Sequence, residues 1–277
     1  MVIQHNIAAI NSYRNLSTNQ SALSKNLEKL SSGYKINRAG DDAAGLAISE
    51  TMRSQINGLN QAVNNANDAI GLIQTAEGAM TETHSMLQRM KTLSTQAANG
   101  TYTKTARDNI QAEINALNKE IGRIATTTEF NGEKPLSPAV TAGKTANLTF
   151  FIGASADASN AMTVAQMTMT AAALTIDQIA VDNTTNAFKA MKSIDAAIEK
   201  VSTYRATLGA AQNRLEHTVN NLKVTSENIT SAESRIRDTD MADEITAYTK
   251  NNILLQAAQS MLSQSNAMPQ GVLSMLQ

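Results

Sequence analysis

A regular apolar pattern runs along the C-terminal half of the chain. Large apolar residues recur at every seventh position in this row: Ile194, Val201, Leu208, Leu215, Leu222, Ile229 and Ile236. The positions three residues later are mostly small, as at Ala197 and Ala211. This spacing predicts a seam along one face of a long helix. Because a helix cannot bury its own seam, the pattern predicts packing against other long helices, and it indicates that function should be sought in assembly.

The N-terminal half carries matching patterns. One row at a spacing of seven contains Met52, Leu59, Ala66, Ile73, Met80 and Leu87, and a second, offset row contains Ile56, Val63 and Ile70. A shorter helical repeat follows at Ile110, Ile114, Leu117, Ile121 and Ile124. We assign Ile56, Leu59, Val63, Ile70 and Ile73 to the seam that faces the C-terminal row. Three amphipathic helices can bury their stripes against each other as a bundle.

Helix-breaking and turn-forming residues between these patterns indicate where the expected helices and strands begin and end. Gly33 and the run Gly40–Asp42 indicate a helix end and a short joint, and Asn131-Gly132 indicates a turn. A strand is expected at 147–153, with 162–169 as its possible partner. The expected helices span residues 3–31, 45–98, 104–128 and 183–238.

The last stretch of the chain is unusual because Asn251–Gln277 contains no charged residue. Its apolar residues lie on a background of Gln, Ser, Asn and Ala, and include Leu254, Leu255, Met261, Leu262, Val272, Leu273 and Leu276. The first residues share this character more weakly, at Ile3, Ile7 and Ile10. Uncharged amphipathic helices suit burial among other protein surfaces and are marginal alone in water. We therefore predict that both chain ends are assembly segments.

Composition narrows the function classes. Hydrophobic residues make up 42% of the 277 residues, but aromatic residues only 3%, and Trp and Cys are absent. Such a mixture suits thin helix–helix seams better than a compact enzyme core. A net charge of −1 does not indicate nucleic acid or an anionic membrane as a partner. The first residues lack the features of a secretory signal peptide, and no apolar run is long enough for a membrane span. The chain is expected to be cytoplasmic, or exported without a cleaved signal.

Catalytic chemistry finds little support in the sequence. The histidines His5, His84 and His217 stand apart, and no His, Cys or carboxylate cluster has the spacing of metal ligands. Asp41 and Asp42 suit a helix start. A cluster of charged residues at 235–244 is either a solvated helix surface or a salt-bridge joint between two rods. We predict no enzymatic activity and no cofactor.

Several longer motifs occur in a fixed order along the chain. They are Ile7–Asn11, Leu27–Asn37, Ala39–Ile48, Gln96–Thr101, Glu129–Gly132, Ala267–Gln270 and Val272–Leu276. Together they resemble the bacterial flagellins, the subunits of the flagellar filament. Between about 133 and 185 the resemblance is limited to Leu148–Ala154, which indicates a flagellin with a short central region.

The resemblance implies a mainly α fold in which long antiparallel helices from both chain ends form coiled-coil or bundle rods, with a small β-hairpin in the middle. The implied domains are a terminal inner coiled coil (1–44 with 236–277), a helical rod (45–132 with 183–235) and a short β and loop region (133–182). The implied partners are further copies of the chain, filament cap and junction proteins, and the flagellar export apparatus with its chaperone. The implied location is the extracellular flagellar filament.

The resemblance also implies recognition by the host receptor Toll-like receptor 5. In recognised flagellins, an arginine and a leucine on the long rod helix and a glutamate on the next helix make the contacts. The matching positions here are Arg89, Leu93 and Glu113. The alternative is that these residues only contact neighbouring subunits.

Other interpretations stay open at this point. A hook–filament junction protein would share the terminal helices but usually diverges between them. A cytoplasmic coiled-coil scaffold would carry charged outer faces at both ends. A membrane-active helical protein would need a basic amphipathic face.

Overall fold

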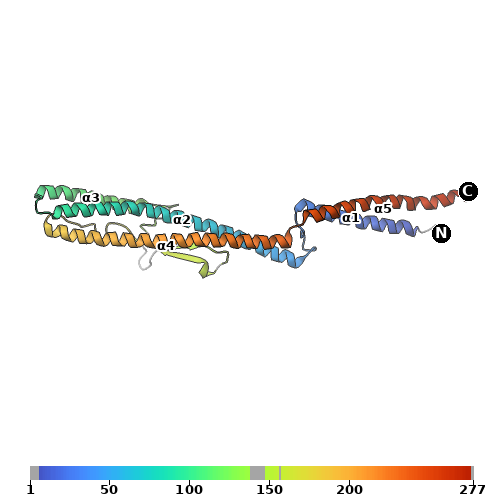
Figure 1. Ribbon diagram of the computed structural model, residues 1–277, viewed down its shortest axis with the longest axis horizontal. Coiled ribbons are helices and arrows are strands. Elements are labelled where there is room, and N and C mark those ends of the chain that lie inside the picture. The colour runs from blue at the N-terminus through green and yellow to red at the C-terminus, as the bar shows by residue number, and fades with distance from the viewer. Residues whose placement is uncertain (1–5, 138–146, 156, 276–277) are drawn as a thin grey trace. The chain divides into compact units, whose positions relative to one another are not determined.

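The computed structural model describes residues 6–137, 147–155 and 157–275 (Figure 1). Five long helices and one small antiparallel sheet make up these residues, so the mainly α class is confirmed. The elements are α1 (Ile7–Ser32), α2 (Ala43–Ala98), α3 (Lys104–Thr127), β1 (Asn147–Phe151), the 3-10 turn η1 (Ala158–Asn160), β2 (Ala161–Ala165), α4 (Thr184–Arg237) and α5 (Met241–Met275).

The hairpin is shorter than the sequence predicted. Strand β2 ends at Ala165, so the expected strand over 162–169 is wrong in its second half. Met162 and Val164 point into the core, but Met167 is exposed and Met169 donates its backbone N–H to the carbonyl of Leu136 instead of pairing with β1. Loose alternation of methionines did not distinguish a strand from an extended connection.

The chain divides into two compact units, which we describe separately. The terminal unit comprises Met1–Ser54 with Glu227–Gln277, and the rod unit comprises Gln55–Ser226. Helices α2 and α4 contribute residues to both units.

The rod unit has a continuous hydrophobic core supplied by α2, α3 and α4. Helix α4 contributes Ile194, Val201, Leu208 and Leu215, each at most 2% exposed. Helix α2 contributes many small residues, among them Ala62, Ala66, Ala69 and Ala76, between larger ones such as Ile73, Met80 and Leu87. Small side chains on α2 let the facing helices approach closely, so that the large residues of α4 fill the space between them.

Two side-chain amides of α3 hold the extended connection that leads to α4. Gln111 donates to the carbonyl of Ile179 at 2.8 Å and accepts from the N–H of Val181 at 2.7 Å. Asn118, which is buried, donates to the carbonyl of Ile176 at 2.6 Å. These amides supply the hydrogen bonds that a neighbouring strand would otherwise give to this backbone. Without them, backbone N–H and carbonyl groups beside the core would lack partners.

The hairpin and one tight turn complete the rod unit. In the hairpin, Leu148 pairs with Val164 and Phe150 with Met162. The Asn131-Gly132 turn has positive φ at both residues, 52° and 84°. On either side of it, Phe130 and Glu133 each donate a backbone N–H to the carbonyl of the other. Positive φ at both central residues defines the tight turn that Asn-Gly favours, so this predicted turn is confirmed.

In the terminal unit α1 and α5 lie side by side, and a joint connects α1 to α2. Helix α1 ends at Gly33, whose φ of 74° lies in the left-handed region and whose N–H bonds to the carbonyl of Lys29. This is the glycine helix end that the sequence predicted.

Candidate assembly surfaces

The pair of helices in the terminal unit leaves large apolar side chains uncovered. Ile7 and Ile10 on α1 are 63% and 53% exposed, and Leu254 and Met261 on α5 are 41% and 63% exposed. Leu255 and Leu262 are half-buried. Ile3 and Leu276 lie outside the described residues, as do the side chains of Val272 and Leu273. Ile253, another apolar residue of the uncharged C-terminal stretch, is also 61% exposed. Apolar side chains exposed on this scale are typical of surfaces that contact other proteins.

The same unit has almost no apolar core of its own. Among its described residues, Ile36 is the single buried hydrophobic residue, whereas Asn26, Ser49 and Ser265 are buried polar residues. Polar contacts link the two helices, for example from the amide of Asn6, the N-cap of α1, to the carbonyl of Ser265 at 2.8 Å. Because apolar burial supplies most of the stability of a helix pair, this pair lacks the contacts that would stabilise it alone.

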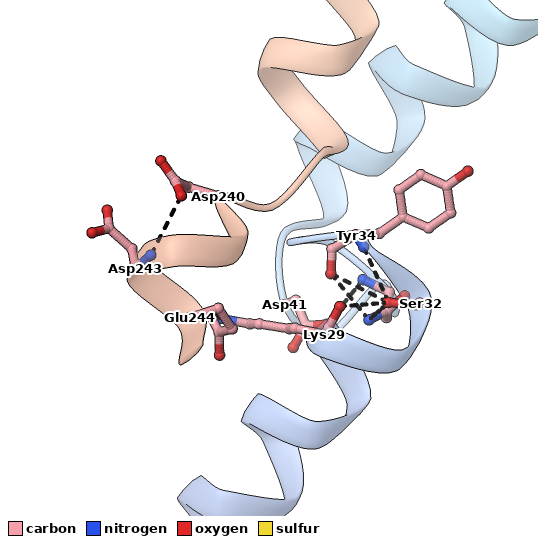
Figure 2. A network of polar contacts seen from close by, with 8 residues as sticks. Lys29, Ser32, Tyr34, Asp41, Asp240, Asp243 and Glu244 are labelled. Atoms are coloured by element: carbon pink, nitrogen blue, oxygen red, sulfur yellow. Dashed lines mark hydrogen bonds and ion pairs between the residues drawn. The ribbon is translucent and has the colours of Figure 1, made fainter. Parts of the chain in front are cut away.

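A polar network fills the joint between α1, α2 and the start of α5 (Figure 2). The Ser32 hydroxyl accepts from the N–H of Tyr34 and from the Asn37 amide, and the Lys29 ammonium lies 3.7 Å from Glu244. Backbone N–H groups of Arg38 and Asn37 donate to the Asp41 carboxylate and hold its pKa below the usual value. The joint is therefore ordered by hydrogen bonds rather than by a hydrophobic seam.

Arg237 connects three parts of this joint. Its guanidinium donates to Glu50 at 2.8 Å, lies 4.6 Å from the centre of the Tyr34 ring, and is only 11% exposed. Its carbonyl accepts from the N–H of Lys35 at 2.7 Å. The charged cluster at 235–244 thus includes a salt-bridge joint, because Arg237 contacts both the segment that follows α1, at Tyr34 and Lys35, and helix α2, at Glu50.

The predicted rod seam divides at the border of the rod unit. Ile194, Val201, Leu208, Leu215 and Leu222 are buried, but Ile229 and Ile236, which fall in the terminal unit, are half-buried. On α2, Leu59 and Ile73 are buried, whereas Ile56, Val63 and Ile70 are half-buried. Apart from Ala66, the alanines that make up much of this α2 face were not predicted, although their spacing of three and four residues was a usable signal.

The three positions matched to receptor recognition differ in exposure. Arg89 and Glu113 are exposed and form an ion pair at 2.8 Å between α2 and α3. Leu93 is 3% exposed and belongs to the core. The structure thus brings the two charged residues together on the surface and places the leucine beneath it.

Within the described residues, no group of three or more His, Asp or Glu side chains is placed to hold a metal ion. Among the same residues, no helix is both long and apolar enough to span a membrane. Long helices, a hydrophobic core in the rod unit and exposed apolar side chains in the terminal unit are the features of a self-assembling structural protein.

Comparison with known proteins identifies the family. Residues 3–141 match the bacterial flagellin N-terminal helical region, and residues 191–276 match the C-terminal helical region. The chain is 51% identical to the flagellin of Bacillus subtilis (strain 168) and 47% identical to the flagellar filament 33 kDa core protein of Treponema phagedenis, with 100% of each chain covered. The crystal structure of Bacillus cereus flagellin superposes with a TM-score of 0.50 at 32% identity, covering 61% of this chain and 94% of that one. The chain belongs to the bacterial flagellin family.

This family defines the chain as a structural subunit of the extracellular flagellar filament, with a short central region. A putative flagellar hook-associated protein of Vibrio parahaemolyticus superposes with a TM-score of 0.60 but is only 12% identical, so it shares the fold alone. The two relatives named above match over their full length and are a flagellin and a flagellar filament core protein, which gives the junction-protein alternative no support.

Substitutions in the joint are expected to change filament shape more often than they abolish assembly. A Cβ at Gly45 would lie 2.5 Å from an Asp42 carboxylate oxygen and 2.8 Å from Cδ1 of Ile36, so in Gly45→Ala both side chains must shift, and the hydrogen bond from the Gly45 N–H to Asp42 (2.9 Å) is disturbed. Interrupted helices of this kind can hold two alternative arrangements. We expect Gly45→Ala filaments with an altered waveform in electron microscopy. Gly78→Ala is the matched control, because nothing lies within 4 Å of its added methyl group. A Gly45→Ala variant with native waveform, or without filaments, would contradict the prediction.

Proposed function

We propose that the terminal unit makes the contacts that polymerise the filament, and that the rod unit serves as the preformed body of each subunit. The observation that carries the proposal is the uncovered apolar face of α1 and α5 in a unit with one buried hydrophobic residue among those described. Covering such side chains with neighbouring subunits would supply the burial that the single chain lacks.

Point substitutions on this face test the proposal without deleting a helix. Ile10→Ser and Met261→Gln change side chains that are 53% and 63% exposed, and they hardly alter helix propensity. The monomer should keep its helical signal and melting temperature. Burial of an Ile or Met side chain is worth about 1.5 to 3 kcal/mol, so each substitution should raise the critical concentration for polymerisation about tenfold or more.

Val224→Asn provides the matched control, because Val224 is a similarly exposed apolar residue (57%) on the rod unit. Critical concentrations come from sedimentation of filaments grown at a series of protein concentrations. If Ile10→Ser and Met261→Gln polymerise like the Val224 variant, the terminal face does not drive assembly.

The same face accounts for the partners that the family implies. Before assembly an export chaperone would cover the apolar side of α5, and at the filament ends cap and junction proteins would cover it. Export through the flagellar apparatus, without a cleaved signal peptide, suits a terminal unit with little core to unfold. N-terminal sequencing of the exported protein tests this route, since removal of a leader would contradict it.

For the host receptor, the proposal rests on the exposed Arg89–Glu113 ion pair. Leu93 would act by keeping α2 in place, because its side chain is buried in the core. Arg89→Ala should therefore weaken receptor signalling without changing the melting temperature, whereas Leu93→Ala should lower both.

A further inference from the structure

A groove of about 500 Å³ opens on the rod unit between α2, the turn at 130–133 and strand β1. Three of the chain's four phenylalanines line it: Phe130, Phe150 and Phe151. Aromatic residues make up only 3% of this chain, and Trp is absent. One surface site therefore holds most of the phenylalanine rings, and three of the nine aromatic residues of the chain.

The fold holds these rings in place from three sides. The ring of Phe130 lies beside Gly71 of α2, where a Cβ would be 3.5 Å from Cε2 of the ring. The Asn65 amide donates to the carbonyl of Phe151 at 3.0 Å and ties β1 to α2. Phe150 packs partly against the core, whereas Phe151 is 42% exposed. The groove thus combines fixed walls with one accessible ring.

The charge of the groove is negative. Asp68 and Glu133 line it, both are exposed, and its lining contains no Lys or Arg. In the part of the chain that the structure describes, neither carboxylate forms an ion pair. Lys134 follows Glu133 in the turn and is exposed, but it does not line the groove. Aromatic rings together with carboxylates attract a cation, through the ring faces and through ion pairing.

We propose that this groove receives a lysine side chain from a second copy of the chain in the filament. In a filament every subunit is surrounded by copies, and the rod unit offers exposed lysines that form no ion pair among the described residues: Lys104, Lys119, Lys189, Lys192 and Lys223. The aliphatic stem of lysine would lie along the phenylalanine rings, and its ammonium group would reach a carboxylate. The inference rests on filament assembly but uses a surface different from the terminal helices.

Zero-length crosslinking with a carbodiimide tests the contact directly, because it joins a carboxylate to an amine only when the two touch. Filaments are grown from an equal mixture of unlabelled and ¹⁵N-labelled protein, crosslinked, digested and analysed by mass spectrometry. We expect mixed-isotope crosslinks between the peptides of Asp68 or Glu133 and a lysine peptide, in filaments and not in monomers. The proposal would be overturned if Asp68 and Glu133 formed crosslinks only within one isotope, for example to Lys134. It would also be overturned if these two carboxylates formed no crosslinks while other carboxylates of the filament did.

Two variants measure what the groove contributes. Asp68→Asn with Glu133→Gln removes the charges, and Phe151→Leu keeps an apolar side chain but removes the ring. Each should raise the critical concentration about two- to fivefold, the range expected for one exposed cation contact. Asp177→Asn with Glu199→Gln, and Phe188→Leu, are the matched controls, since these residues are exposed and lie outside the groove.

The outcomes separate this proposal from the one on the terminal helices. If groove variants assemble like their controls, the groove is not a contact, although the terminal face can still drive assembly. If Ile10→Ser and Met261→Gln assemble normally while the mixed-isotope crosslinks appear, the groove proposal stands and the terminal proposal falls.

Discussion

Removal of Asn251–Gln277 is expected to leave a soluble, helical monomer that forms no filaments. The deletion takes away Ile253, Leu254 and Met261, which are 61%, 41% and 63% exposed, and with them the partner of the first half of α1. The core of the rod unit is built from residues 66–219 and loses nothing. At about 1.5 kcal/mol or more for each large apolar side chain that neighbouring copies would bury, assembly should fall beyond measurable concentrations.

Three measurements check this expectation. Circular dichroism should show a helical protein whose main melting transition matches that of the full chain, because that transition belongs to the rod unit. Sedimentation and negative-stain microscopy should show monomers under conditions in which the full chain polymerises. The control is a full-length chain with Phe188→Gln and Val224→Asn, which removes exposed apolar residues from α4 instead and should still polymerise. Filaments of normal length from the truncated chain would refute the assembly role of α5.

The sequence predicted the long helices because their apolar residues follow a strict period. The heptad row on α4 is buried from Ile194 to Leu222, as a seam requires. The row continues with the same spacing to Ile229 and Ile236, yet these side chains are only half-buried. The period of the apolar residues predicts the helix that contains them. It does not show where along that helix the partner helices end and burial stops.

Other structural features could not be predicted, because the residues that form them also occur commonly in other structural roles. Alanines such as Ala62 and Ala76 count little in a hydrophobic pattern, but they are almost fully buried and set the helix spacing on α2. Gln111 looks like a solvent-facing amide, and only the fold reveals that it binds the backbone at 179–181. The groove lined by Phe130, Phe150 and Phe151 could not be predicted, because it forms only when the turn and the hairpin both pack on α2.

Placement of a charge in the rod seam should have the second large effect. Leu215 is 0% exposed and lies in the hydrophobic core of the rod unit. In Leu215→Asp, the new carboxylate would lack both water and a cation, and the site would lose the apolar burial of leucine. Changes of this kind cost about 4 kcal/mol or more, a large part of the stability of a domain. The main cooperative melting transition should therefore fall by many degrees or disappear.

Val224→Asp is the control for this substitution, because it places the same charge on the same helix at a side chain that is 57% exposed. Its melting temperature should stay within a few degrees of the unchanged chain, as is usual for surface substitutions. Thermal unfolding followed by circular dichroism, with calorimetry for cooperativity, distinguishes the two variants. Equal transitions for Leu215→Asp and Val224→Asp would mean that Leu215 faces solvent, and that the heptad row of α4 is not the seam that holds the rod unit together.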